Sequence, residues 1–277
     1  MLINLLDYLN VTTDKTPDRT AVIDGDRTIS FRDLSGNAKK LSNIISKKTD
    51  SIIRKPIAVF MDKHIESIEA DIAIIYSGNA YMNLDTKTPM QRISNILSLI
   101  QPELVITNQQ YIDRFDGAWE KDKLLNIDLI DYNKETYSQD NINSTLNMII
   151  DTDPLCIINT SGSTGVPKGV VLNHRSFIDF TEWAKDTTGI GDNEVIGSLS
   201  PLVFDIYSFE LCMLMALGST IMIIPDSLSA FPARILQLLL QHNVTYIFWV
   251  PTIMVNIANM DLLSKISLKF LKSIWFA

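Results

Sequence analysis

The sequence predicts an α/β fold built on largely parallel sheets. Short apolar runs of strand length alternate along most of the chain with longer segments whose apolar residues recur at helical spacing. Such alternation is typical of parallel strands joined by helical crossovers. One polar stretch, residues 109–152, interrupts the alternation and indicates a junction between a first subdomain, residues 1–150, and a second subdomain, residues 151–277.

The first subdomain opens with a helical pattern and a hairpin pattern. The N-terminal MLINLLDYLN is typical of an amphipathic helix, and AVIDGDRTISF (21–31) predicts a hairpin that turns at Asp24-Gly25. Four apolar residues at helical spacing predict the next helix: Leu34, Ala38, Leu41 and Ile45. The other elements expected here are strands at 56–61, 79–85 and 103–108, a helix at 65–77, and a helix from Pro89 to about Ile100.

The polar stretch itself carries only weak strand signals (LLNIDLI, 124–130) and a predicted exposed loop at 132–147. Alternation then resumes, with strands expected at 156–160, 169–173, 194–200, 219–225, 244–250 and 273–277. Helices are expected at 174–188, 209–217, 233–242 and 252–260. A chain seldom stops on an apolar strand without a polar tail, so the final SIWFA leads us to expect a sequence that is cut short.

Composition and charge argue against several classes of partner. The chain carries 32 Asp and Glu against 24 Lys and Arg, a net charge of −8, which disfavours nucleic acid or an anionic membrane as the main partner. The longest apolar region, 211–225, is shorter than the about 20 residues of a membrane span. Cys156 and Cys212 lie in apolar runs, which fits buried thiols, a reducing compartment and a cytoplasmic location. The three histidines show no metal-ligand spacing, so no metal ligand is expected among these residues.

The most informative segment is TSGSTGVPKGV (160–170), directly after the predicted strand CIINT. Glycines let backbone N–H groups turn toward a bound oxyanion, Ser and Thr hydroxyls add donors, and Lys168 adds a positive charge. The segment therefore has the chemistry needed to hold a polyphosphate. It is not a Walker A loop, because Lys168 follows Pro167 and precedes Gly169, and it contains no GxGxxG fingerprint. A flexible hairpin loop between two strands is the alternative interpretation.

Three segments together resemble the adenylate-forming superfamily, which includes the adenylation domains of nonribosomal peptide synthetases, acyl- and aryl-CoA ligases, and luciferase. TSGSTGVPKGVVLNHRS (160–176) is similar to its phosphate-loop signature. Residues 79–108 resemble an upstream segment, and residues 200–225 resemble the Phe-Asp-x-Ser region of the amino-acid-activating branch. The resemblance covers essentially the whole chain. It implies the N-terminal core of the adenylate-forming fold, with two stacked, mostly parallel sheets flanked by helices, truncated before the C-terminal lid domain.

The resemblance also implies roles for individual residues. Asp205 matches the aspartate that binds the α-ammonium group of an amino-acid substrate, and a helix N-cap is its alternative role. The family's serine after Phe-Asp-x is replaced by Tyr207, with Ser208 one position later. Three apolar residues fall where the family lines its side-chain pocket, with plain core packing as their alternative: Ile206, Phe209 and Phe248. The ATP phosphates would be held by residues of the loop, of which Lys168 is also the candidate catalytic residue: Thr160, Ser161, Gly162, Ser163, Thr164, Gly165, Lys168 and Gly169.

The reaction implied by the resemblance joins ATP and an amino acid into aminoacyl-AMP and pyrophosphate. A carrier-protein phosphopantetheine thiol would then accept the aminoacyl group, and Mg²⁺ would be needed, with its ligand expected beyond residue 277. Because the C-terminal lysine of the family is not among these residues, we expect the chain alone to be inactive. Asp205 favours an amino-acid substrate, since a desolvated ammonium group needs a carboxylate partner. An acyl- or aryl-CoA ligase, a D-alanine–carrier-protein ligase and a noncatalytic nucleotide-binding fragment remain as alternatives.

Overall fold

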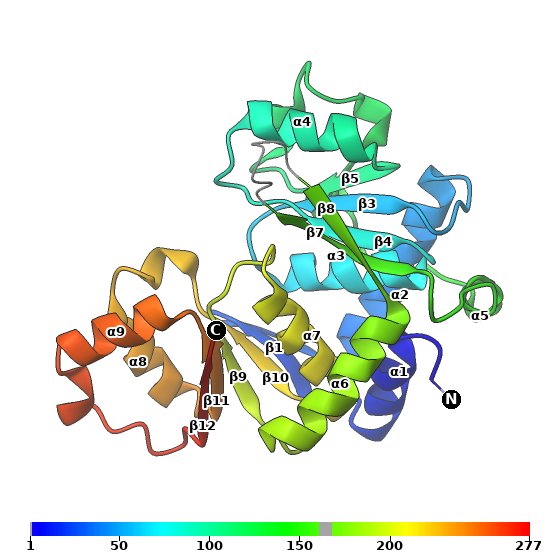
Figure 1. Ribbon diagram of the computed structural model, residues 1–277. Helices are drawn as coiled ribbons and strands as arrows, with labels where there is room; N and C mark the ends of the chain where they lie inside the picture. Colours follow the sequence, from blue (N-terminus) through cyan, green and yellow to red (C-terminus); the bar gives the residue numbers. More distant parts are fainter. Residues whose placement is uncertain (1, 161–167) are drawn as a thin grey trace. The chain divides into compact units, whose positions relative to one another are not determined.

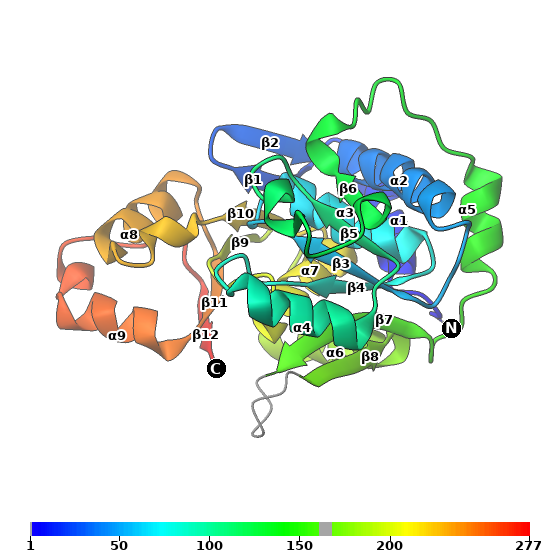
Figure 2. The ribbon, with the colours of Figure 1, turned by 90° about the horizontal axis from the view of Figure 1, so that it is seen from above.

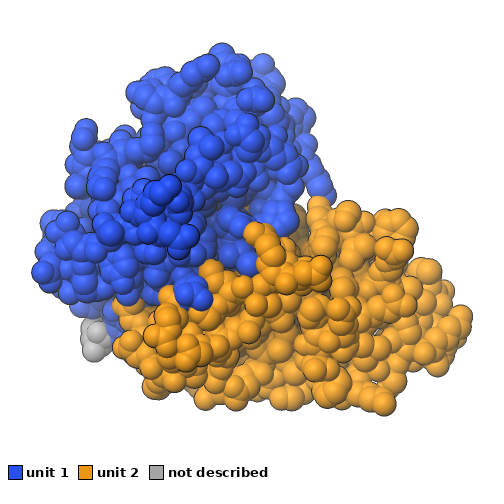
Figure 3. All heavy atoms as spheres, turned by 180° about the vertical axis from the view of Figure 1, so that it is seen from behind, with its two compact units in different colours: residues 1–7, 33–180 blue, residues 8–32, 181–277 orange. Residues whose placement is uncertain are grey.

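The computed structural model describes residues 2–160 and 168–277, which divide into two compact units (Figures 1 and 3). Their bounds are residues 1–7 with 33–180 for unit 1, and residues 8–32 with 181–277 for unit 2. The boundary between the two units differs from the junction expected near residue 150. The polar stretch is internal to unit 1, and an N-terminal segment belongs with the C-terminal part of the chain.

Unit 1 is built on a six-stranded sheet in the order β6-β5-β3-β4-β7-β8. Neighbouring strands are parallel except for β7 and β8, which form an antiparallel hairpin. Because β7 follows the polar stretch and pairs with β4, that stretch does not separate the two units. The bounds are β3 Pro56–Phe60, β4 Ala80–Asn83, β5 Leu104–Thr107, β6 Leu124–Asn126, β7 Pro154–Thr160 and β8 Lys168–Asn173, with helices α2 Phe31–Lys48, α3 Ile65–Tyr76, α4 Met90–Ile100 and α5 Gln139–Leu146.

Unit 2 is built on a second six-stranded sheet, in the order β12-β11-β9-β10-β1-β2. Here too only one pair is antiparallel, the β1–β2 hairpin, in which Gly25 has a φ of +60°. The N-terminal hairpin joins this sheet because β1 pairs in parallel with β10. The bounds are β1 Thr20–Asp24, β2 Arg27–Ser30, β9 Val195–Ser198, β10 Thr220–Ile223, β11 Tyr246–Trp249 and β12 Ser273–Phe276, with helices α7 Asp205–Leu217, α8 Pro232–Gln241 and α9 Pro251–Asn259. Two further helices, α1 Leu6–Lys15 and α6 His174–Thr188, begin in unit 1 and end in unit 2.

The predicted α/β fold with mostly parallel sheets flanked by helices is confirmed, and two details of the prediction are wrong. The exposed loop expected at 132–147 contains α5, which begins after Ser138, whose Oγ accepts the N–H of Asn141 at 3.3 Å. Only Ile142 on α5 is buried, so the helix has no apolar stripe that a pattern search would detect. The helix expected at 209–217 starts four residues earlier, at Asp205.

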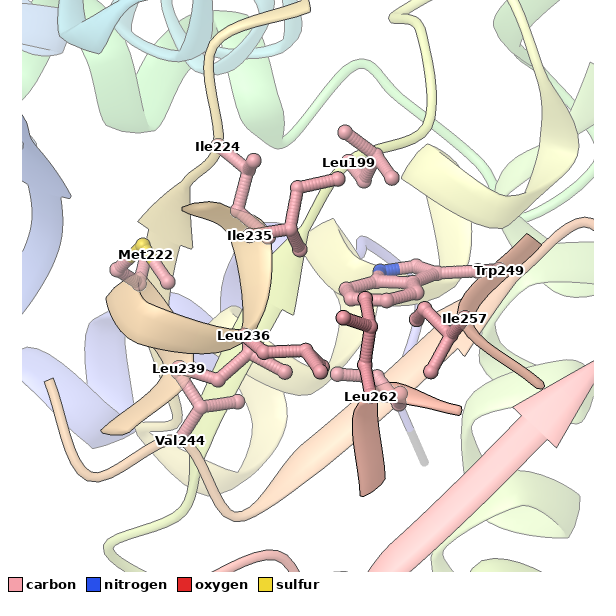
Figure 4. Close-up of a cluster of buried hydrophobic side chains, with 11 residues drawn as sticks. Leu199, Met222, Ile224, Ile235, Leu236, Leu239, Val244, Trp249, Ile257 and Leu262 are labelled. Carbon is pink, nitrogen blue, oxygen red and sulfur yellow. The ribbon is translucent and has the colours of Figure 1, made fainter. Parts of the chain in front are cut away.

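Each unit has its own apolar core. In unit 1, α4 packs on one face of the sheet, where Ile93 and Leu97 meet Phe60 of β3 and Ile157 of β7. In unit 2, side chains from β10, α8, β11 and α9 form one cluster, in which Ile257 and Leu262 lie beside the indole of Trp249 (Figure 4). The Trp249 Nε1–H donates to the Gly197 carbonyl oxygen at 2.8 Å, which fixes β11 beside β9.

Cys156 on β7 and Cys212 on α7 are both buried free thiols, as predicted. Burial raises the pKa of the Cys212 thiol to about 12, so this group is not a thiolate nucleophile at neutral pH. In the part of the chain that the structure describes, no helix is long and apolar enough to cross a membrane.

Candidate functional site

The predicted phosphate-loop segment lies at the open end of the β7–β8 hairpin in unit 1. β7 ends at Thr160 and β8 begins at Lys168, and these two residues form the last described pair of the ladder. The Thr160 hydroxyl donates to the Lys168 carbonyl oxygen at 3.4 Å, and both residues are exposed. Within the described ranges, Lys168 forms no ion pair. The other loop residues named from the sequence lie outside the described residues: Ser161, Gly162, Ser163, Thr164 and Gly165.

Asn159, one residue before Thr160, is a polar residue at the hairpin mouth that the sequence analysis missed. Its side-chain Oδ1 and Nδ2 are both buried and have no hydrogen-bond partner among the described residues. A buried amide left unpaired costs about 1–3 kcal/mol, so such a group usually has a partner. Strand alternation places Asn159 on the same face of β7 as Ile157. In the sequence, the one signal for Asn159 as a site residue is its position directly before the predicted phosphate loop.

Gly169 has a packing role of its own. A Cβ added there would lie 2.9 Å from Ile157 Cγ2, which is closer than real Cβ contacts allow, and a tight 3.1 Å from Ile100 Cδ1. Glycine at this position therefore lets β8 pair tightly with β7 beneath the end of α4. This explains the residue without a ligand, so the phosphate role of Gly169 stays a prediction.

The described residues of the hairpin mouth fit a polyphosphate group. The Lys168 ammonium, the Thr160 hydroxyl and the unpaired Asn159 amide are all donors of the kind that bind phosphate oxygens. They do not fit a metal cage, because among the residues that the structure describes no group of three or more His, Cys, Asp or Glu could hold an ion. The expectation that the Mg²⁺ ligand lies beyond residue 277 stays a prediction.

Asp205, the predicted partner of a substrate ammonium group, is the first residue of α7 in unit 2. The N-cap position of that helix is Phe204, yet the Asp205 side chain accepts a free N–H of the first turn, so the capping role that was its alternative stays open beside the ligand role. Its Oδ1 accepts the N–H of Ile206 at 2.9 Å, and the side chain is exposed. The positive end of the helix dipole favours a carboxylate at this position. In the described part of the chain Oδ2 has no partner, so one carboxylate oxygen is available to a cation.

The predicted pocket residues Phe209 and Phe248 meet in the structure. Their ring centroids are 5.3 Å apart with the ring planes at 82°. Phe209 also lies 6.1 Å from Tyr246, and Tyr246 stacks on Trp275 at 6.5 Å. We call these four residues the aromatic cluster. Phe209 follows Asp205 by four residues on α7, so the carboxylate and the cluster lie on one helix face.

Of the other residues near the predicted pocket, Ile206 is buried, whereas Tyr246 and Trp275 belong to the aromatic cluster. Ile206 is 4% exposed and lies three residues before Phe209, which is compatible with plain core packing. Tyr246 and Trp275 were not predicted as part of a site. Alternation along β11 puts Tyr246 on the same face as Phe248, with Trp249 in the core on the other face. That pattern could have indicated Tyr246, whereas Trp275 is placed only by the pairing of β12 with β11.

Comparison with known proteins relates the chain to a family and to curated relatives. A family model described as AMP-binding enzyme matches residues 9–276. The chain is 26% identical over 243 residues to zwittermicin A synthase ZmaJ of Bacillus cereus, covering 87% of this chain and 44% of that protein. It is 28% identical over 253 residues to the delta-poly-L-ornithine synthetase of Acinetobacter baumannii, covering 90% of this chain and 18% of that protein. The chain thus spans less than half the length of these relatives.

Solved structures share the fold. The nonribosomal peptide synthetase FmoA3 in its alpha-methyl-L-serine-AMP bound form has a TM-score of 0.81 at 22% identity, covering 93% of this chain and 28% of that one. The N-terminal domain of FACL13 from Mycobacterium tuberculosis has a TM-score of 0.80 at 16% identity, covering 99% of this chain and 69% of that one. At these identities the likeness shows the fold alone.

Proposed function

The chain belongs to the AMP-binding enzyme family, and from this premise we propose that it is the part of an amino-acid-activating enzyme that binds ATP and the amino acid from which the aminoacyl adenylate forms. The observation that carries the amino-acid part of this proposal is Asp205. Its exposed carboxylate begins α7 on the same helix face as the aromatic cluster. A carboxylate beside an apolar wall suits a substrate that carries an ammonium group next to a side chain.

The phosphate part of the proposal rests on the β7–β8 hairpin. Lys168 and Thr160 would contact the β- and γ-phosphates of ATP and the pyrophosphate that leaves, and the Asn159 amide would supply a further donor there. The FmoA3 structure is also known in an AMPPNP-bound form, which supports an ATP site in this fold. ATP binding by this chain is therefore part of the proposal.

The proposed reaction is an in-line displacement at the α-phosphorus of ATP. A carboxylate oxygen of the amino acid forms a bond to that phosphorus, the bond to the bridging oxygen breaks, and pyrophosphate leaves with the electron pair. The residues of this chain would contribute by holding the two reactants and by balancing charge, with no covalent intermediate on the protein. Asp205 would hold the ammonium group, while Phe209 and Phe248 would contact an apolar side chain of modest size.

A second step would transfer the activated group to a carrier protein. The thiolate of a phosphopantetheine arm attacks the carbonyl carbon of the aminoacyl adenylate, a thioester bond forms, and AMP leaves. The similarity to a delta-poly-L-ornithine synthetase supports this step by analogy. A panel of amino acids would identify the substrate, and a panel of carrier proteins would identify the acceptor.

Calorimetry with the chain tests the amino-acid role directly. Asp205→Asn removes the charge and keeps the size, and Asp192→Asn is a matched control at an exposed position of unit 2. In the presence of a non-hydrolysable ATP analogue, we expect amino-acid binding to weaken about ten- to hundredfold in Asp205→Asn only, because a charge-assisted hydrogen bond contributes roughly 1.5–3 kcal/mol. Binding of the ATP analogue should be unchanged in both variants.

A panel of ligands separates the alternatives. Amino acids should bind, whereas carboxylic acids with the same side chain and no amino group should not, because they leave the Asp205 carboxylate unpaired. The reverse preference would favour an acyl- or aryl-CoA ligase instead. Failure of the ATP analogue to bind, or its unchanged binding in Lys168→Ala, would contradict the phosphate role of the hairpin.

A further inference from the structure

Unit 1 contains a polar cavity that the proposed activity does not use. It has a volume of about 440 Å³, within the range of roughly 300–1,000 Å³ that is usual for small-molecule sites. Its walls come from the second half of α2, the end of α3, Ser51, and residues 137–145 in and before α5. Figure 2 shows the C-terminal end of α2 pointing toward α5 at the margin of this unit.

The helix faces on either side of this cavity are polar. α5 and its N-cap contribute Ser138, Asn141, Ile142 and Thr145, a spacing that places these residues on one face. Only Ile142 among them is apolar. A helix packed on its neighbour normally presents an apolar face, because burial of that face stabilises the contact. The space between α2 and α5 is therefore not filled as a core would be.

Several polar groups that line the cavity have unused hydrogen-bonding capacity. Asn43 Nδ2 donates to the Thr136 carbonyl oxygen at 2.9 Å, so that group is satisfied. By contrast, the hydroxyls of Ser46 and Ser51 and the ammonium group of Lys47 have no protein partner within residues 2–160 and 168–277. These groups all come from residues 46–51, at and just after the end of α2, and they line the same space as the polar residues of α5. Water would satisfy them in the empty protein, and a ligand with matching groups can replace that water.

The charge in the cavity is positive. Lys47 is a cation on its wall, and no carboxylate lines it. A second cation, Lys39, lies next to it, with its Nζ 5.5 Å from the ring centroid of Tyr76 and 5.8 Å from that of Tyr137, both of which are lining residues. In the described part of the chain Lys47 has no carboxylate partner, which favours an anionic ligand, and lysine binds phosphate as a point charge. The surrounding hydroxyl and amide groups suit a ligand that carries hydroxyls of its own.

We propose that this cavity binds a small phosphorylated polyhydroxy compound of the sugar phosphate class. Lys47 faces the phosphate group, and the serine and asparagine side chains of α2 and α5 bind the hydroxyls. Because α5 is held by little apolar burial, an occupant of the cavity also holds α5 against α2. The site is separate from the hairpin mouth and does not depend on the proposed adenylation activity.

Isothermal titration calorimetry of the chain with glucose 6-phosphate tests the proposal. Lys47→Gln removes the charge inside the cavity, and Lys48→Gln removes an equal charge from the next residue of the same helix turn, which does not line the cavity. We expect Lys47→Gln to weaken binding about tenfold or more, since a hydrogen bond to a charged group contributes roughly 1.5–3 kcal/mol. Lys48→Gln should leave the affinity unchanged. Glucose, which has the hydroxyls without the phosphate, and inorganic phosphate, which has no sugar hydroxyls, should each bind more weakly than glucose 6-phosphate.

Three results would overturn the proposal. The first is that glucose 6-phosphate does not bind at millimolar concentration. The second is that Lys47→Gln and Lys48→Gln weaken binding equally, which indicates diffuse attraction to the lysines of α2. The third is competition by saturating ATP, which would place the probe at the hairpin mouth. Binding that persists in saturating ATP supports a separate site, and it does so whether or not the chain activates an amino acid.

Discussion

Mildly acidic pH should destabilise the folded chain through one buried histidine. His174, the first residue of α6, is 3% exposed, and its Nδ1 accepts the N–H of Leu5 at 3.2 Å. Burial lowers the pKa of His174 to about 4, against the opposing influence of Asp153, Asp7 and Asp151. The folded chain therefore holds this imidazole neutral at pH values where a histidine in the unfolded chain is protonated.

The sign and size of the effect follow from the two pKa values. An unfolded histidine has a pKa of about 6.5, so between pH 6.5 and 4 the unfolded chain binds more protons than the folded chain does. The free energy of unfolding consequently falls as the pH falls through this window. A pKa difference of about 2.5 corresponds to a loss of about 3 kcal/mol, complete below pH 4 and absent above pH 7.

Urea denaturation across this pH window measures the loss. His174→Asn removes the titrating group, while the Asn Oδ1 can still accept the N–H of Leu5. The free energy of unfolding should therefore fall by about 3 kcal/mol less in this variant than in the unchanged chain, with carboxylate contributions common to both. His242→Asn, at the partly exposed C-terminal end of α8, is the control and should follow the unchanged chain. Parallel curves for His174→Asn and the unchanged chain would refute the argument from burial.

Three further changes test the packing and the two parts of the candidate site. Gly169→Ala should lower the free energy of unfolding, measured by urea denaturation, by about 1–3 kcal/mol, because the new Cβ would lie 2.9 Å from Ile157 Cγ2. An unchanged denaturation midpoint would contradict this close packing. Lys168→Ala should weaken ATP binding in calorimetry without changing amino-acid binding, and equal loss of both would indicate misfolding instead. Phe248→Ala should shift amino-acid preference toward larger side chains in a competition assay, since it removes the ring packed on Phe209, and an unchanged ranking would argue for a plain core role.

Most elements of the fold were predictable because their signals are local. The apolar stripe of α2 and the Asp24-Gly25 turn are properties of a few neighbouring residues, and both appear where the sequence places them. α5 escaped prediction because its stability comes from a cap and a single buried Ile142. The pairing of β1 with β10 also escaped, because hydrophobic patterning says that a strand is buried and not which distant strand it joins.

The candidate site was predictable to the extent that it follows a family motif. Asp205 and Phe209 come from the same motif, and the structure places them four residues apart on one helix face. Asn159 lies one residue before the phosphate-loop motif. Its amide is buried and unpaired in the described structure, which depends on the pairing of β8 with β7 and could not be predicted from neighbouring residues. Trp275 joins the aromatic cluster through strand pairing, which depends on the whole sheet and not on neighbouring residues.

The start of the chain supports the amino-acid part of the candidate site. α7, which presents Asp205 and Phe209, ends with carbonyl groups that need partners. Thr12 Oγ1 donates to the Met215 carbonyl oxygen at 2.7 Å, and the Arg19 guanidinium donates to the Gly218 carbonyl oxygen at 3.2 Å. A cation at the C-terminal end of a helix is also favoured by the helix dipole. Residues 8–32 thus anchor one end of the helix whose other end carries the Asp205 carboxylate, so this N-terminal segment belongs to the scaffold of the proposed amino-acid site although it is remote in sequence.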